Sequence, residues 1–157
     1  MEAWGLEKDD VLHEALLNSY RILPPRIYDF KKMMYTPGYA GEDFLNMDPY
    51  FISDKKKKEG ICLSVKGLSN GAVAVLYPGV IKKLVEFMDG GFYVVFSSVH
   101  EALIYSSKLC SLEELENLLR TSNARMTFQK EFLTDKVYYY CKEEDKFIML
   151  RGSMKML

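Results

Sequence analysis

The spacing of apolar residues along the chain predicts three helices. Between residues 8 and 20, apolar side chains recur at helical spacing and form one stripe that we expect to be buried, made of Val11, Leu12, Ala15, Leu16 and Tyr20. Residues 79–88 show the same spacing and end at Gly90-Gly91, which suits a helix C-terminus. A third helix follows Ser111, because Ser-Leu-Glu-Glu is a capping box ahead of regularly spaced leucines.

Alternating or continuous apolar runs predict six strands. Residues 61–66 alternate between apolar and polar positions, as a half-buried strand does. Asn70-Gly71 follows as a hairpin signal, and the apolar run after it fits the second strand of that hairpin. The predicted strands are residues 61–66, 72–77, 92–96, 102–105, 137–141 and 147–150.

The order of these elements predicts an α+β fold. A helix and an irregular segment precede a β-β-α-β-β-α core, and a hairpin follows it. We therefore expect a two-layer sandwich, with a mainly antiparallel sheet and the helices on one face. The 157 residues suit a single domain, composed of a helical and irregular part (1–58), the core (59–125) and the C-terminal hairpin (126–157).

Residues 25–52 are the least regular part of the sequence and hold seven aromatic residues and three methionines. Such side chains are enriched in protein interfaces, where large apolar groups gain most from losing water. The same residues could instead form a lid over the open face of the sheet, and the sequence leaves both alternatives open. The residues that we expect to contact a partner protein are Tyr28, Phe30, Met33, Met34, Tyr35, Tyr39, Phe44, Tyr50 and Phe51.

The stretch Ser-Ser-Val-His-Glu at residues 97–101 carries the residue types of a nucleophilic site. Ser97 or Ser98 with His100 and Glu101 would serve a small hydrolase or transferase. However, the motif G-x-S-x-G is absent, and polar residues in a hairpin loop also bond to the turn backbone. We expect that structural role and keep catalysis as the alternative. With only two histidines and no phosphate-binding motif in the sequence, we expect neither a metal site nor a cofactor.

The charge balance argues against nucleic-acid binding. The sequence has 21 basic and 22 acidic residues, whereas phosphate binding needs a concentrated basic face. Two local features nevertheless keep this alternative open, one a basic run and the other a cluster of aromatic rings that could stack on unpaired bases. They are Lys55, Lys56, Lys57 and Lys58, and Tyr138, Tyr139 and Tyr140.

Several features predict a cytoplasmic protein that makes no membrane contact. The three cysteines lie far apart and form no C-x-x-C pair, which fits reduced thiols. The apolar stretch at residues 72–81 is interrupted by Pro78-Gly79 and is too short to span a bilayer. The first ten residues lack the apolar core of a signal peptide.

Several motifs resemble a known family. The runs VAVLYPGVIKKL, FYVVFSSVHEALIY and LTDKVYYYCKEEDK, with WGLEKDDVLHEALLN and ILPP upstream, are similar to the C-terminal part of the domain of unknown function 5688. That family comprises uncharacterised proteins of gut Firmicutes. The resemblance spans Trp4 to Lys146 and departs from the family pattern between Tyr28 and Lys58. It implies a shared fold for the second half of the chain and no particular activity.

Together these features predict a non-enzymatic module that binds another protein. We expect it to act as a regulator or inhibitor of a bacterial or phage-related macromolecular target, of the kind that mobile elements carry. The irregular aromatic segment carries this prediction, because it is the part that departs from the family pattern. The sequence leaves the oligomeric state open.

Overall fold

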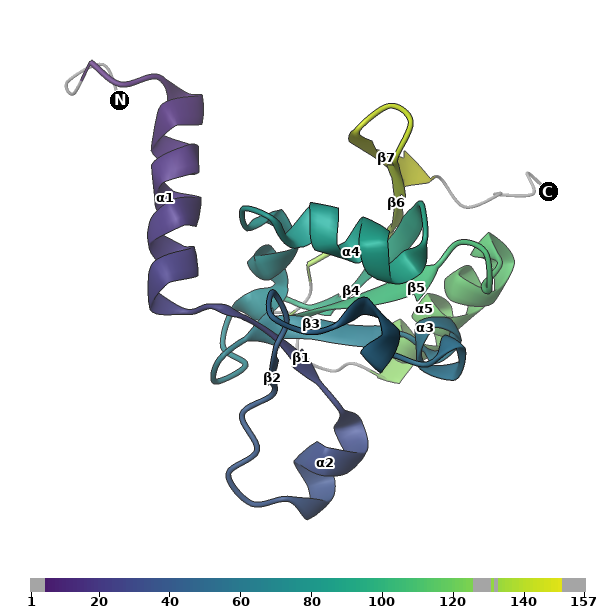
Figure 1. Ribbon diagram of the computed structural model, residues 1–157. Helices are drawn as coiled ribbons and strands as arrows, with labels where there is room; N and C mark the ends of the chain where they lie inside the picture. The colour runs from purple at the N-terminus through teal and green to yellow at the C-terminus, as the bar shows by residue number, and fades with distance from the viewer. Residues whose placement is uncertain (1–4, 126–130, 132, 151–157) are drawn as a thin grey trace.

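The computed structural model describes residues 5–125, 131 and 133–150. Its centre is one open, fully antiparallel sheet of seven strands in the order β2-β1-β3-β5-β4-β6-β7 (Figure 1). The predicted α+β class and antiparallel sheet are confirmed, as is the C-terminal hairpin. The strands are β1 (Pro25–Tyr28), β2 (Glu42–Asp43), β3 (Ile61–Val65), β4 (Phe92–Ser98), β5 (Glu101–Ser106), β6 (Val137–Cys141) and β7 (Lys146–Leu150).

Along the chain, α1 precedes the first strand, and the other helices fall between successive strands. All three predicted helices begin within one residue of their predicted starts, and short helical pieces occupy much of the segment that the sequence left irregular. The helices are α1 (Lys8–Ile22), α2 (Phe30–Tyr35), α3 (Asp54–Glu59), α4 (Val80–Met88) and α5 (Leu112–Arg125), with short 3₁₀ helices η2 (Pro49–Phe51) and η3 (Gly71–Leu76). Across residues 5–125, 131 and 133–150, none of them combines the length and apolar character that crossing a membrane requires.

Helices cover both faces of the sheet, rather than the single face that we expected. In β4 and β5, successive side chains point to opposite faces, and both sets are apolar. Val94 and Ile104 belong to the main core, which contains the buried side of α4. Val95 and Tyr105 belong to a second core cluster, which α5 completes with Leu115 and Leu119. A sheet that is apolar on both faces needs a helix on each.

The predicted strand at residues 72–77 is wrong, because this segment forms the 3₁₀ helix η3. Asn70 adopts a left-handed conformation and precedes η3 instead of joining two strands. Gly71 lies so close to β3 that an added Cβ would stand 2.0 Å from Ser64 Oγ. A short apolar run fits a buried strand and a buried helical turn equally well, so periodicity could not separate them.

The sequence also missed β1, which lies within the segment predicted to be irregular. Ile27 pairs with Leu63 of β3 on one side and with Glu42 of β2 on the other. The strand opens with Pro25, a position where proline is tolerated because no ladder hydrogen bond needs its nitrogen. The Pro24-Pro25 pair signalled the end of the preceding helix and hid the start of this strand.

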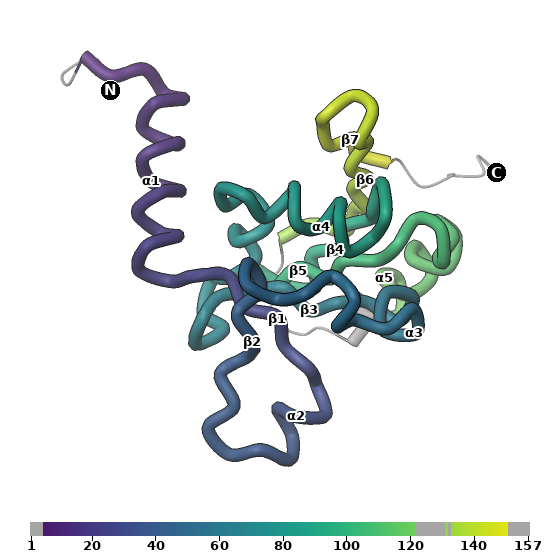
Figure 2. The backbone as a smooth tube through the Cα atoms, in the orientation of Figure 1, coloured from purple at the N-terminus to yellow at the C-terminus, as the bar shows by residue number. Residues whose placement is uncertain are grey.

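Helix α1 stands away from the rest of the molecule, as Figures 1 and 2 show. The predicted burial of its apolar stripe is wrong, since no residue of α1 is buried and Leu12 is 55% exposed. Leu16, at the middle of the helix, and Tyr20, near its C-terminal end, are partly buried against the main core. The ring of Tyr20 meets that of Tyr77 edge-on, with 6.0 Å between the ring centroids. The helix therefore contacts the core through its C-terminal half.

Candidate functional site

The chain leaves the sheet after β1 and makes an excursion that carries α2 before it returns as β2 (Figure 2). Asp29 starts α2 as its N-cap, since Oδ1 accepts hydrogen bonds from the backbone N–H of Lys31 at 2.9 Å and of Lys32 at 3.1 Å. The Tyr39 hydroxyl closes the base of the excursion by accepting a hydrogen bond from the Asp29 N–H at 3.2 Å. The excursion thus has fixed ends and a projecting helix.

The predicted partner-binding residues divide into three groups by burial. Tyr28 and Phe44 are buried, and Phe44 stacks on Phe87 of α4, so placing these two on a contact surface is corrected: they belong to the core. Tyr39 is half-buried. The remaining six side chains are exposed, and they are Phe30, Met33, Met34, Tyr35, Tyr50 and Phe51. Part of the segment is therefore a lid, and part is a surface.

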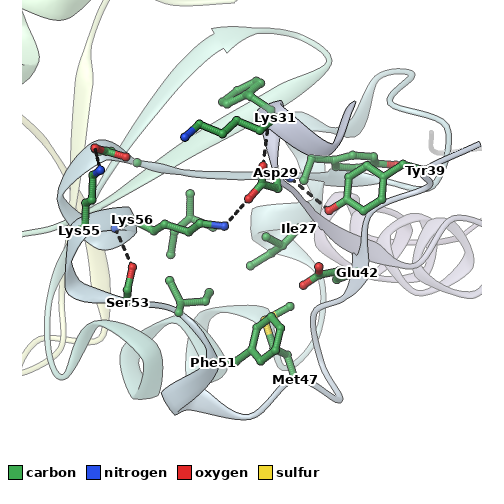
Figure 3. A pocket seen from close by; sticks show the side chains of 16 residues that line it. Ile27, Asp29, Lys31, Tyr39, Glu42, Met47, Phe51, Ser53, Lys55 and Lys56 are labelled. Atoms are coloured by element: carbon green, nitrogen blue, oxygen red, sulfur yellow. Dashed lines mark hydrogen bonds and ion pairs between the residues drawn. The ribbon is translucent and has the colours of Figure 1, made fainter. Parts of the chain in front are cut away.

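A cleft of about 310 Å³ lies beside this exposed group, at the ends of β1 and β3 (Figure 3). Its walls come from α2, η2 and α3, and each of these elements begins at a capping residue. Asp48 accepts from the Tyr50 N–H at 2.9 Å, and Ser53 accepts from the Lys56 N–H at 3.4 Å. The apolar part of the lining includes Ile27, Phe30, Tyr39, Met47, Phe51 and Ile52.

Most charged groups around the cleft are paired. Lys56 of α3 donates to the Asp29 carboxylate and so ties α3 to the start of α2 (Figure 3). This hydrogen bond, followed by those from the backbone, lowers the pKa of Asp29. Lys32 bonds to Glu42 at 2.6 Å, and this contact raises the pKa of Lys32. With these charges neutralised, the cleft presents mainly apolar surface to an incoming group.

The two features that favoured nucleic-acid binding lie apart in the fold, and most of their side chains contact other groups of the protein. In the basic run, Lys56 contacts Asp29, Lys57 lies 3.7 Å from Asp54, and Lys55 lies 3.9 Å from Glu59. The tyrosine cluster belongs to β6, which is three positions along the sheet from β3, the strand that follows α3. All three rings pack within the protein: Tyr138 on Phe96, Tyr139 on Tyr93, and Tyr140 on Phe92 and Phe147.

The Ser-Ser-Val-His-Glu loop is the turn between β4 and β5, and its side chains bond to the turn and to neighbouring loops. Ser97 Oγ donates to Glu101 Oε1 at 2.8 Å, and Ser98 Oγ accepts from the His100 backbone N–H at 3.0 Å. His100 Nδ1 accepts from the Asn70 N–H at 3.0 Å. Among the hydrogen bonds between described residues, neither serine bonds to the imidazole. The four candidates are adjacent but not arranged as nucleophile and base.

The buried thiol nearest this loop is held in its neutral form. Cys62 Sγ donates to Glu101 Oε2 at 3.5 Å. Burial, reinforced by the neighbouring Glu101 carboxylate, raises the pKa of the Cys62 thiol far above its usual range. A protonated, buried thiol is a poor nucleophile. Within the described ranges, no three side chains of His, Cys, Asp or Glu gather as metal ligands would.

Sequence reasoning missed the cleft itself and the Asp29–Lys56 pair that frames it. The capping residues carried a local signal, because Asp29, Asp48 and Ser53 each precede a helical turn. The pair joins residues 27 positions apart, and no local pattern announces such a contact.

Comparison with known proteins supports the family resemblance. No curated protein and no solved structure matches the chain. A family model described as a family of unknown function (DUF5688) matches residues 1–142. This range covers nearly the whole chain, including α1, the aromatic excursion and the sheet through β6. The chain belongs to this family of unknown function.

Proposed function

We propose that this protein is a non-enzymatic binding module that receives an apolar segment of a partner protein against α2, η2 and the cleft between them. The observation that carries the proposal is the set of six exposed large apolar side chains on α2 and η2, two of which, Phe30 and Phe51, line the cleft between these elements. Tyr50 is 95% exposed and Tyr35 is 78% exposed. Exposed apolar groups gathered in one place are typical of interaction sites, whereas single ones are ordinary.

The arrangement of the surface supports binding without large rearrangement. Phe30 and Phe51 come from different elements and line the same cleft. The capping of α2 by Asp29 and the contact of Asp29 with Lys56 hold two of the walls in place. A surface that is already ordered loses less conformational entropy when it binds. Aromatic side chains on such a surface supply the anchors that dominate many interfaces.

The wider role that we propose is regulation or inhibition of a bacterial or phage-related target in the cytoplasm. The composition and the isolated, unpaired cysteines support a cytoplasmic location. The role as a regulator or inhibitor is motivated by the loop at residues 97–101, whose side chains bond to the turn instead of forming a catalytic set.

Affinity capture followed by measurement with the purified partner tests the proposal. The tagged chain is used as bait, and the captured protein is then titrated against Tyr35→Ala and Phe51→Ala. Because anchor residues contribute about 2 kcal/mol or more, we expect each change to weaken binding roughly 30-fold. Leu118→Ala and Met149→Ala are matched controls, since these side chains are also partly exposed but lie on α5 and β7. If the partner bound all four variants with equal affinity, the proposed binding surface would be wrong.

The two alternatives predict different results. A hydrolase or transferase that uses Ser97, Ser98, His100 and Glu101 would turn over a model ester, and His100→Ala would abolish that turnover. A nucleic-acid binder would be retained on a polyanion column and released steeply as salt rises. Either outcome, with no effect of Tyr35→Ala, would replace the proposal.

A further inference from the structure

The loop at residues 66–70, which joins β3 to η3, has an unfavourable backbone conformation. Leu68 and Asn70 adopt positive φ angles of 57° and 54°. The left-handed region is costly for residues that carry a side chain, and leucine lacks the local hydrogen bonds that make asparagine tolerant of it. Such a conformation persists only where surrounding contacts hold it. The contacts of this loop therefore decide whether it keeps its shape.

Each end of the loop donates a backbone hydrogen bond to a side chain outside it. Near β3, the Gly67 N–H donates to the Tyr28 hydroxyl at 3.3 Å. Next to η3, the Asn70 N–H donates to His100 Nδ1 at 3.0 Å. Burial raises the pKa of Tyr28 above its ordinary value, so this hydroxyl stays neutral near physiological pH. Imidazole, in contrast, ordinarily changes its charge between about pH 5 and 8. Of these two bonds, the one at the Asn70 end is therefore the one that depends on pH in this range.

The hydrogen bond at Nδ1 exists only while His100 is neutral. A ring nitrogen that accepts a hydrogen bond carries no proton, so the neutral ring holds its proton on Nε2. When the imidazole gains a second proton, that proton goes to Nδ1, and two donors then face each other. The Asn70 N–H consequently loses its acceptor.

The backbone of His100 is fixed independently of its ring. Its carbonyl accepts a hydrogen bond from Ser64 Oγ at 2.6 Å, and its N–H donates to Ser98 Oγ at 3.0 Å. Neither serine hydroxyl titrates near neutral pH. The turn between β4 and β5 therefore stays in place when the ring changes its charge.

The charged groups near the ring favour this change. Glu131 Oε1 lies 3.5 Å from His100 Nε2, so its carboxylate would pair with the imidazolium. Glu101, the next residue along the chain, bonds instead to Ser97, whose Oγ lies 2.8 Å from Glu101 Oε1. Lys66 belongs to the loop but lies at the end opposite Asn70. Protonation of the ring therefore removes its contact with the loop and keeps its contact with Glu131.

We propose that His100 is a pH-sensitive switch: its neutral imidazole holds the loop at residues 66–70 against the turn between β4 and β5, and its protonation releases the Asn70 end of that loop. The end at Gly67 stays bonded to Tyr28. The positive φ angles of Leu68 and Asn70 favour opening once the acceptor is lost. Because the closed loop requires the neutral ring, opening increases as pH falls from about 8 to about 5.

NMR of the full chain labelled with ¹⁵N tests the switch directly. At about pH 8 we expect a scalar coupling across the hydrogen bond between the Asn70 amide nitrogen and His100 Nδ1, and at about pH 5 we expect none. The protection of the Asn70 amide against hydrogen exchange, corrected for the intrinsic effect of pH, should fall about fivefold over this range. Its midpoint should match that of the His100 ring signals, and the Gly67 amide should keep its protection. A coupling that persists while the ring gains its proton, or equal loss of protection at Gly67 and Asn70, would overturn the proposal.

Two variants separate His100 from other groups that titrate. His100→Asn keeps a side-chain oxygen that can accept a hydrogen bond near the place of Nδ1, and it does not titrate. In this variant the protection of the Asn70 amide should no longer depend on pH between about 5 and 8. His13→Gln is the matched control, because His13 is the other histidine of the chain and is exposed on α1, so this change should leave the pH dependence as it is in the wild type. If His100→Asn keeps the pH dependence, or His13→Gln abolishes it, another group controls the loop and the switch is refuted.

Discussion

Substitutions of Asp29 test most directly how the walls of the cleft are held, because its carboxylate makes two separate contacts. Oδ1 caps α2 by accepting two backbone N–H groups, and Oδ2 accepts a hydrogen bond from Lys56 of α3. Asp29→Ala removes both contacts. Asp29→Asn keeps a good capping side chain and removes the charge. Lys56→Ala removes the contact with α3 and keeps the cap. Comparison of the three variants therefore separates the two contributions.

The magnitudes follow from the exposure of the groups. Loss of an N-cap costs about 1 kcal/mol. The Lys56 side chain is 54% exposed, so its ion pair with Asp29 contributes on the order of 0.5–1 kcal/mol. We therefore expect Asp29→Ala to destabilise the fold by about 1.5–2 kcal/mol, and Asp29→Asn and Lys56→Ala by 0.5–1 kcal/mol each. For a chain of this size, the larger loss lowers Tm by roughly 3–8 °C.

Urea denaturation at neutral pH measures these differences, and hydrogen exchange at the Met33 amide, which bonds to the Asp29 carbonyl, locates them in α2. The double variant Asp29→Asn/Lys56→Ala should cost no more than one single change, because both remove the same contact. If Asp29→Ala costs no more than Asp29→Asn, the cap contributes nothing, and our account of how α2 is held would be refuted.

The same pair makes a pH-dependent prediction. The pKa of Asp29 is lowered in the folded protein, chiefly by the hydrogen bond from Lys56. Its charge therefore stabilises the fold fully above the unfolded-state pKa of about 3.9, and this contribution disappears as pH falls through the lower folded-state pKa. The stability difference between wild type and Asp29→Asn should shrink below about pH 4. A difference that stays constant down to pH 2 would contradict the assigned contact.

Three further predictions concern the packing around the site. Burial raises the pKa of Tyr105 to about 12. The neutral phenol of Tyr105 should therefore stabilise the fold fully below about pH 10, and this contribution should be lost as pH rises towards 12. In alkaline denaturation, Tyr105→Phe should lose less stability over that range than the wild type. Gly60→Ala, with φ +102° and a new Cβ 2.7 Å from the Tyr105 ring, should cost roughly 2–4 kcal/mol, whereas Gly38→Ala, with φ +75° and open space, should cost about 1 kcal/mol in urea titrations. Phe44→Ala should cost about 3–5 kcal/mol because the ring is fully buried, whereas Tyr50→Ala should change stability by less than about 0.5 kcal/mol; equal costs would contradict the division into lid and surface.

The sequence predicted elements well where one local signal governed them. The capping box at Ser111 started α5, and Glu114 completes it by accepting the Ser111 N–H at 2.9 Å. Alternation predicted the strand β3, although both of its faces are buried, whereas we expected one. The polar turn after Cys141 predicted the C-terminal hairpin. In each case the residues that specify the element lie within a few positions of one another.

Predictions failed where a distant contact decided the outcome. The apolar run after Asn70 became η3, because Gly71 packs against β3 and the Ala72 N–H bonds to the Val99 carbonyl. Periodicity carries no information about those partners. The stripe on α1 was predicted correctly as a stripe, but its burial depended on whether the domain supplies a surface for it. The cleft likewise depends on Asp29 meeting Lys56 across the fold.

The aromatic segment shows how position relative to the sheet decides the fate of similar side chains. Tyr28 lies on β1 and is fixed in register with Cys62 of β3, so its ring is buried and its hydroxyl donates to the Val65 carbonyl at 2.8 Å. Tyr35 lies at the end of α2, seven residues further on and outside the sheet, where no strand pairs with it. A count of aromatic residues does not distinguish Tyr28 from Tyr35. An exposed apolar surface therefore forms where the chain leaves the sheet and its apolar side chains have no strand to pack against. For this reason exposure, rather than aromatic content, identifies the residues to mutate.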